Sequence, residues 1–227
     1  SITVPSTIHR YLFPYQVEGV KWNWTFRYPT GAESNELHVP MGEPVELLIS
    51  SKDVLHSVFI PAFRVKQDAV PGRYTRLWFE ATMPGEFPFY CTEYCGTSHS
   101  GMITKAKVYE TRAEFDEWLK SALNPYEGKS PAEAGALVWE RKGCKTCHTN
   151  DGSNLVGPSF KGIWGATREF EDGSTGTVDE NYILESIQMP AAKIVKGYQN
   201  VMVANGGQEL SDEERDFLVA YITSLAN

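Results

Sequence analysis

The sequence predicts a multi-domain chain, with an all-β domain over residues 1–124 and a mostly helical domain over residues 131–227. Short segments rich in β-branched and aromatic residues, separated by turn signals, fill residues 17–109. The hydrophobic period changes to that of a helix at Thr111. A turn-rich stretch, residues 125–130, is the predicted linker. With 227 residues, the chain is long enough for two domains that each bury a core.

The expected strands of the first domain alternate between apolar and polar residues. Pro71-Gly72 and Pro84-Gly85 mark turns between them. The expected strands are residues 20–28, 37–40, 45–50, 56–60, 75–80, 87–90 and 103–109. Several short strands at this spacing indicate a β-sandwich or a β-barrel.

Three capping boxes predict where helices begin. In this motif, a Ser or Thr and a Glu three residues later satisfy free backbone amides at the helix start. The motif occurs at Thr111–Glu114, Ser130–Glu133 and Ser211–Glu214. The helix after Ser130 is expected to run into Cys144, and a further helix is expected over residues 179–188. Between the later helices lie long loops, which a large cofactor could hold together.

The charge is acidic and unevenly distributed. Lys and Arg number 21 against 29 Asp and Glu, which gives a formal net charge of −8. Residues 1–124 hold 12 basic and 14 acidic residues (−2), and residues 125–227 hold 9 and 15 (−6). This balance argues against a nucleic-acid partner. The second domain is suited to a basic or uncharged partner, although solubility alone would explain its acidity equally well.

No stretch approaches the roughly 20 apolar residues that a membrane-spanning helix needs. The first residues, Ser1 to Pro5, also lack the charged and apolar regions of a signal peptide. The chain as given is therefore expected to be soluble, either by nature or after removal of a membrane anchor.

The sequence contains 4 cysteines, which in a secreted protein would by default form two disulfides in one of three pairings. Their spacing argues against that default. Cys91, Cys95, His99 and Met102 supply two thiolates, an imidazole and a thioether within one short segment, and copper selects these soft ligands. By themselves, the two cysteines would favour a disulfide or a single-metal site.

A dinuclear copper site would need more donors than this segment supplies. Two thiolates on one loop could both bridge a pair of copper ions, and each ion would then take one imidazole and one weaker ligand. His56, which opens an expected strand, is the available second imidazole. The backbone carbonyl of Glu93 would complete the set.

The second cysteine pair lies in a Cys-x-x-Cys-His pattern, typical of covalent c-type haem attachment. Cys144 and Cys147 would form thioethers to the haem vinyl groups, and His148 would coordinate the iron. The segment from Val156 to Ile163 resembles a loop of class I cytochromes c. This resemblance implies that the carbonyl of Pro158 accepts a hydrogen bond from the iron-ligating histidine.

The other face of the haem iron needs a ligand, and Met is usual in electron-transfer cytochromes. Met189 is followed directly by Pro190, and a Met-Pro pair is seen at the methionine ligand of many cytochromes. Met202 ends the segment from Lys193, which resembles the ligand loop of cytochromes fused to oxidase subunits. We favour Met202, although Val203 stands where that resemblance would place a proline.

Residues 17–120 resemble subunit II of haem-copper cytochrome c oxidases, whose soluble domain is a cupredoxin-like barrel that holds the dinuclear copper centre CuA. The resemblance includes Trp22-Asn-Trp24, the segment from Ser51 to Ser57, and the segment from Lys66 to Arg73. It implies bridging thiolates at Cys91 and Cys95, imidazole ligands at His56 and His99, a thioether ligand at Met102 and a carbonyl ligand at Glu93. It also implies that the Glu93 side chain reaches a magnesium ion at the boundary with subunit I, and that electrons from cytochrome c enter at Trp22.

The order of the two domains resembles subunit II of the oxidases that carry their own haem, in which an all-α class I cytochrome c domain follows the barrel. The resemblance implies a route from an external donor, such as a cytochrome or a cupredoxin, through haem c and CuA to subunit I, which reduces dioxygen and pumps protons. This chain would perform only the transfers. The family's subunit II begins with two transmembrane helices that this sequence lacks, so we interpret it as a soluble fragment of a protein on the outer face of the bacterial cytoplasmic membrane.

Four alternatives belong to other classes or enzymes. A CuA-containing nitric oxide reductase subunit would share both cofactors, whereas nitrous oxide reductase carries Trp where this chain has Glu93. A copper-delivery protein could hold one Cu(I) with Cys91 and Cys95, but it would need neither Met102 nor a haem. The last alternative is a disulfide-linked secreted module without metals.

Overall fold

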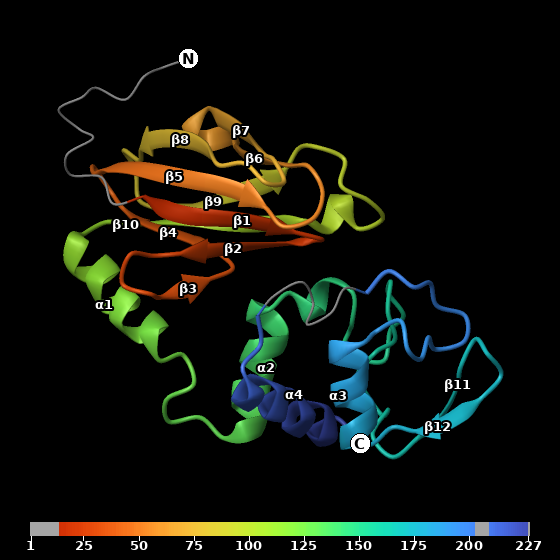
Figure 1. Ribbon diagram of the computed structural model, residues 1–227. Coiled ribbons are helices and arrows are strands. Elements are labelled where there is room, and N and C mark those ends of the chain that lie inside the picture. Colours follow the sequence, from red (N-terminus) through yellow and green to blue (C-terminus); the bar gives the residue numbers. More distant parts are fainter. Residues whose placement is uncertain (1–13, 203–208, 227) are drawn as a thin grey trace. The chain divides into compact units, whose positions relative to one another are not determined.

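The computed structural model describes residues 14–202 and 209–226. The chain divides into two compact units, Ser1–Pro125 and Tyr126–Asn227 (Figure 1). The parts of the predicted domains that fall on residues 1–13, 203–208 and 227 lie outside the described residues. No helix among the described residues combines the length and the apolar character needed to cross a bilayer.

The first unit contains two five-stranded sheets (Figure 1). One sheet has the order β3-β2-β1-β5-β8, with bounds Glu33–Ser34, Asn23–Arg27, Tyr15–Val20, Pro44–Ser51 and Thr75–Glu80. The other has the order β4-β10-β9-β6-β7, with bounds Leu37–Pro40, Ile103–Tyr109, Gly85–Cys91, His56–Ile60 and Val65–Ala69. The helix α1 (Arg112–Leu123) follows the last strand. The prediction of an all-β fold with a closing helix is therefore confirmed for this unit.

Strand boundaries differ from the prediction where the strands are polar. The strand expected over residues 20–28 is β2, which begins only at Asn23, and β1, which ends at Val20 and pairs with β2 antiparallel, was not predicted. β1 carries Glu18 and Gly19, and β7 carries Lys66, Gln67 and Asp68, so neither shows a clear apolar alternation. β7 lies at the edge of its sheet, where polar residues are tolerated.

The second unit contains the helices α2 (Pro131–Arg141), α3 (Glu180–Gln188) and α4 (Asp212–Ser224). All three predicted capping boxes are present. The helix α2 ends at Arg141, before Cys144, because Gly143 adopts a left-handed conformation with φ 77°. A short 3-10 helix, η3 (Cys144–Thr146), follows.

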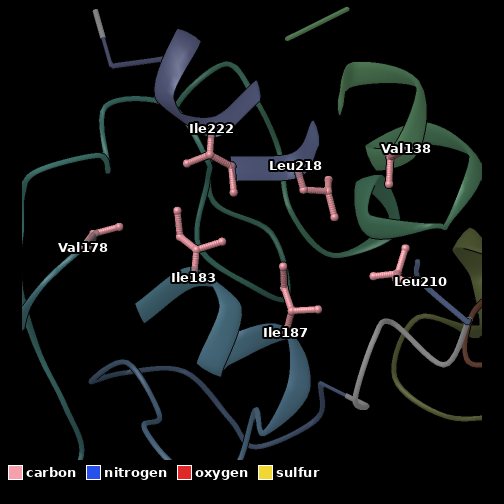
Figure 2. Packing of buried hydrophobic residues seen from close by; sticks show 7 residues of the cluster. All are labelled: Val138, Val178, Ile183, Ile187, Leu210, Leu218 and Ile222. Carbon is pink, nitrogen blue, oxygen red and sulfur yellow. The ribbon is translucent and has the colours of Figure 1, made fainter. Parts of the chain in front are cut away.

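Apolar residues from all three helices form the core of the second unit. Figure 2 shows these side chains directed toward one another: Val138, Val178, Ile183, Ile187, Leu210, Leu218 and Ile222. The helices α2 and α4 cross closely at Gly135, where a Cβ atom would lie 1.9 Å from the carbonyl oxygen of Phe217. Tyr126, inside the predicted linker, also belongs to this unit, because its ring packs on Phe217 and its hydroxyl donates to Glu214.

The expectation of an all-α second domain is wrong in one respect. A two-stranded hairpin, β11 (Thr167–Glu169) and β12 (Thr175–Thr177), precedes α3. Its turn is formed locally, since the side chain of Asp172 accepts from the amide of Ser174 and Gly173 has φ 83°. β-branched threonines flank this turn on both strands and favour extended backbone.

Candidate metal centres

The predicted copper ligands lie around the loop that joins β9 to β10. Cys91 ends β9, Met102 precedes β10, and the amide of Cys91 donates to the carbonyl of Met102 at 3.1 Å. β6 pairs with β9, with Val58 opposite Cys91. This pairing brings His56, at the start of β6, to the loop.

Two imidazoles flank a pair of cysteine sulfurs. The Sγ atoms of Cys91 and Cys95 lie 3.8 Å apart, and both cysteines are free. The Nδ1 atom of His56 lies 3.8 Å from Cys91 Sγ. The Nδ1 atom of His99 lies 3.5 Å from Cys95 Sγ. One thiol thus faces one imidazole on each side of the pair.

Two weaker donors lie beside the thiols. Met102 Sδ is 3.8 Å from Cys95 Sγ, and the carbonyl oxygen of Glu93 is 3.3 Å from Cys91 Sγ. The residues Cys91, Cys95, Met102 and His56 are buried. Because buried thiolate, thioether and imidazole donors are the set that copper selects, the residues present fit the predicted copper site.

The surroundings of the thiol pair favour one negative charge on it, at Cys91. Burial raises the pKa of Cys91, but hydrogen bonds with His56 and with the backbone outweigh burial and lower that pKa to about 7. Burial and then the charge of Cys91 raise the pKa of Cys95 to about 12. The pair therefore loses its first proton much more readily than its second. Copper binding would remove both protons, since the thiolate is the metal ligand.

Asp53 belongs to this site, although no sequence motif identified it. Its Oδ1 atom lies 2.9 Å from Nε2 of His56, and its carboxylate accepts from the amides of Lys21 and Val54. Burial raises the pKa of Asp53, but these hydrogen bonds outweigh it and hold the pKa below its ordinary value. Since Nε2 is engaged, Nδ1 of His56 faces Cys91, which orients the ring for a metal. An acidic residue three positions before a histidine that opens a strand was the available sequence signal.

Gly19 and Trp22 pack closely against the copper site. A Cβ atom at Gly19 would lie 2.8 Å from Cδ2 of His56, so glycine lets the ring lie directly on β1. The indole nitrogen of Trp22 donates to the carbonyl of Cys95 at 3.2 Å, and this side chain is buried. Trp22 thus contacts the copper loop, and its role as the point where electrons enter stays a prediction.

The predicted haem-attachment cysteines occupy a neutral environment. Cys144 begins η3 and Cys147 follows it directly. Burial raises the pKa of Cys144 to about 12 and that of Cys147 to about 11. Both thiols are therefore protonated at neutral pH, in contrast to Cys91.

His148 is held from several sides. Its Nδ1 atom lies 2.8 Å from the carbonyl oxygen of Pro158, the contact that the cytochrome resemblance implies. Its ring stacks on Phe160 with centroids 4.8 Å apart, and a Cβ atom at Gly157 would lie 2.5 Å from Cε1. Burial lowers the pKa of His148. A neutral imidazole that donates through Nδ1 leaves Nε2 as the ligand atom, which fits an axial haem ligand.

Trp139 is a further residue of this site that the sequence motifs did not identify. It lies on α2, and its indole nitrogen donates to the backbone carbonyl of His148 at 3.0 Å. The neighbouring Tyr221 on α4 accepts a hydrogen bond at its hydroxyl from Asn150. The helix pair therefore holds the chain on both sides of residue 149.

The two candidate methionines differ in exposure. Met189 caps the C-terminus of α3 and is 57% exposed. Met202 is half-buried at the end of the described segment before residue 203. Of the two residues, Met202 is therefore the less exposed.

Two family models match the chain in consecutive regions. The model of the cytochrome c oxidase subunit II periplasmic domain matches residues 30–108, and that of cytochrome c matches residues 132–226. The chain belongs to the cytochrome c oxidase subunit II family, with a cytochrome c domain fused behind the subunit II domain.

Several relatives are themselves subunit II proteins. Cytochrome c oxidase subunit 2 of Alkalihalophilus pseudofirmus is 34% identical over 215 residues, which cover 92% of this chain and 60% of that protein. The subunit 2 of Synechocystis is 45% identical over 124 residues, 54% of this chain and 35% of that protein. The crystal structure of the periplasmic domain of subunit II (CoxB) of Bradyrhizobium japonicum is 30% identical, with a TM-score of 0.47 over 50% of this chain and 94% of that one. The chain thus spans between about a third and 60% of these full-length relatives.

Proposed function

We propose that this chain relays electrons within a terminal oxidase. The route runs from an external donor through a covalent haem c in the second unit to a dinuclear copper centre in the first. From there it continues to subunit I, which reduces dioxygen to water and pumps protons. The observation that carries the proposal is the cluster of two buried free thiols and two imidazoles in a chain that also holds a Cys-x-x-Cys-His turn. The chain itself performs only the transfers.

In the first unit, the copper ligands are Cys91, Cys95, His56, His99, Met102 and the carbonyl of Glu93. When bound, the copper pair would accept and release one electron. The role of the protein chain is to hold these donor atoms in place. The β-rich first unit is consistent with a cupredoxin-like barrel. Asp53 orients His56, and pairing between β6 and β9 holds it near the loop. Ligands held this way need to move little when the charge of the site changes.

In the second unit, which we assign to the class I cytochromes c, Cys144 and Cys147 would hold the haem through thioethers and His148 would coordinate its iron. The contact between His148 and Pro158 supports this assignment. Met202 is the second axial ligand. Met202 is the less exposed of the two candidates, which supports this choice.

The partners follow from the family. The chain would bind subunit I, and the side chain of Glu93 would reach a magnesium ion at that boundary. The external donor would be a cytochrome, a cupredoxin or a similar protein. The full-length protein would be anchored through N-terminal helices, with these units on the outer face of the bacterial cytoplasmic membrane. The match to a periplasmic-domain model supports that location.

Metal analysis, the intact mass and paramagnetic resonance of the purified protein test this proposal together. We expect two copper ions and one iron per chain, a mass increased by one covalent haem, and a mixed-valence copper signal. A single Cu(I) without added haem mass would instead indicate a copper-delivery protein. A disulfide between Cys91 and Cys95 in metal-free protein would overturn the proposal.

The methionine assignment has its own test. Met202→Ala should abolish the low-spin spectrum of methionine-ligated haem, and Met189→Ala should leave it intact. Exposed Met189 serves as the matched control, and the reverse result would assign it as the ligand.

A further inference from the structure

The β11–β12 hairpin is a feature of the second unit that the proposed electron route does not use. It lies between the loop that contains Pro158 and the start of α3 (Figure 1). Its turn is closed by hydrogen bonds between Phe170 and Ser174 and between Gly173 and Phe170. The hairpin is therefore a formed structural element rather than an irregular loop.

One buried side chain anchors this hairpin to the helical core. Phe170 is only 2% exposed, and its ring stacks on that of Tyr182 on α3 with centroids 5.7 Å apart. Gly176 on β12 lies against the same ring, since a Cβ atom there would be 3.1 Å from it. The hairpin is thus fixed to α3 and can hold another segment in place.

The chain that leads to Met202 adds to β11 as a further extended segment. Phe170 and Val195 form an antiparallel bridge. On either side of this bridge, the amide of Glu171 donates to the carbonyl of Ile194 at 2.9 Å, and the amide of Lys196 donates to the carbonyl of Glu169 at 3.0 Å. Two backbone hydrogen bonds therefore fasten residues 194–196 to the hairpin.

Side chains reinforce this attachment at two acidic residues of the hairpin. The ammonium group of Lys196 lies 2.5 Å from the carboxylate of Glu169. The carboxylate of Glu171 accepts from the amide of Gly197 at 2.5 Å. One residue further on, the hydroxyl of Tyr198 donates to Asn154 at 3.2 Å. The segment is therefore held to the hairpin and to the loop that precedes Pro158.

We infer that the β11–β12 hairpin is a positioning element for the distal haem ligand, and that its bonds to residues 194–197 keep the Met202 segment closed over the iron against external ligands. This inference rests on Met202 as the proposed ligand. A methionine segment must open before another molecule can bind the iron. Each hydrogen bond to the hairpin that is lost on opening favours the closed state by roughly threefold to tenfold.

Imidazole binding to the ferric haem of the full chain, measured with the charge-transfer band of methionine-ligated haem, tests the inference. Lys196→Pro removes the amide that donates to Glu169, and we expect imidazole to bind about threefold to tenfold more tightly. Lys196→Met is the matched control, because it keeps the amide and removes only an exposed ion pair. It should change the affinity little. Glu171→Ala, which removes the acceptor for Gly197, is a second variant that does not constrain the backbone and should also tighten imidazole binding.

A double variant separates this inference from the ligand assignment. In a Met202→Ala background the iron is already open, so Lys196→Pro should add nothing to imidazole affinity, which is measured there with the Soret band because the methionine band is absent. If the methionine band of the wild type is still present in Met202→Ala, Met202 is not the ligand, and this inference is overturned with that assignment. If Met202→Ala removes the band while Lys196→Pro and Glu171→Ala bind imidazole like the wild type, the inference alone is wrong.

Discussion

The two candidate metal centres hold their first histidine in the same way but in opposite electrostatic surroundings. At each centre, one ring nitrogen meets an oxygen acceptor, Asp53 for His56 and Pro158 for His148. At each centre, the ring also lies so close to a glycine that a Cβ atom would overlap it. The difference is that the acceptor is a carboxylate at the copper site and a neutral carbonyl at the haem site.

The charge of the acceptor matches the charge of the neighbouring thiols. Burial lowers the pKa of both histidines, but at His56 the carboxylate and Cys91 outweigh burial and raise it. The pKa of Cys91 is lowered to about 7, whereas that of Cys144 is raised to about 12. One site is thus built for bare cations. The other suits the proposed haem attachment, in which thiols would become uncharged thioethers and the imidazole would be neutral. The same residue types serve two chemistries because their surroundings differ.

The largest expected effect separates the two cysteine pairs. Cys95→Ser removes the thiol that lies near Cys91, His99 and Met102, so we expect the dinuclear copper to be lost while the haem stays attached. Metal analysis and intact mass measure both outcomes on one sample. Cys147→Ala is the reciprocal variant, which should retain copper and lose one thioether. Loss of both cofactors in either variant would contradict the independence of the two sites.

The carboxylate at the copper site gives the next effect. Asp53→Asn keeps the shape of the side chain but removes its charge, and we expect copper affinity to fall by about tenfold to a hundredfold. Competition with a copper chelator would measure the change. Asp68→Asn is the matched control, because Asp68, on the strand β7 that pairs with β6, is a hydrogen-bonded carboxylate that accepts from Ser57 and not from a ligand. Equal losses in the two variants would show that His56 does not need a charged partner.

The glycines test whether close packing of the rings matters at both sites. Gly19→Ala and Gly157→Ala would each place a methyl group inside contact distance of an imidazole, and we expect a loss of about 1–3 kcal/mol in the free energy of unfolding of the affected unit. Gly101→Ala is the control, since a Cβ atom there meets nothing within 4 Å. It should change stability by less than about 0.5 kcal/mol. Chemical unfolding followed separately in each unit would measure these values. Unchanged stability at Gly157 would mean that the haem loop relaxes freely.

Local sequence signals predicted much of this molecule. The three capping boxes depend on residues three positions apart, and all three were confirmed. Strands β4 and β10 match the predicted bounds, because their pattern of apolar residues is visible in the sequence. β1, β7 and the β11–β12 hairpin were missed, since their polar residues or short length hide the pattern.

These local sequence signals could not predict contacts between residues that are distant in the sequence. Most of the candidate copper and haem ligands lie in two compact motifs, so their types and spacing indicated them, whereas His56 and Met202 lie outside these motifs. Asp53, Gly19 and Trp139 act through contacts that only the folded chain creates, such as that of Gly19 on β1 with His56 on β6. The sequence could therefore name candidate ligands, whereas the residues that orient them could not be predicted from it.

The smallest expected effect concerns a third feature that the two centres share, besides the oxygen acceptor and the close glycine at each imidazole. The indole nitrogen of Trp22 donates to the carbonyl of Cys95, and that of Trp139 donates to the carbonyl of His148. Trp22→Phe and Trp139→Phe keep an aromatic ring but lose this hydrogen bond. We expect each to cost about 0.5–1.5 kcal/mol of unfolding free energy in its own unit. Trp164→Phe, in the same core as Trp139, is the control for the change of ring.

Spectra would then show whether these indoles position ligands or only stabilise the fold. If they position ligands, Trp139→Phe should change the hyperfine-shifted proton resonances of the haem, and Trp22→Phe should change the copper hyperfine pattern. Each variant should leave the other centre unchanged, because each indole bonds to a ligand of one site alone. Lost stability with both spectra unaltered would assign the two tryptophans to the fold. The parallel between the centres would then extend only to the glycine and the acceptor at each ring.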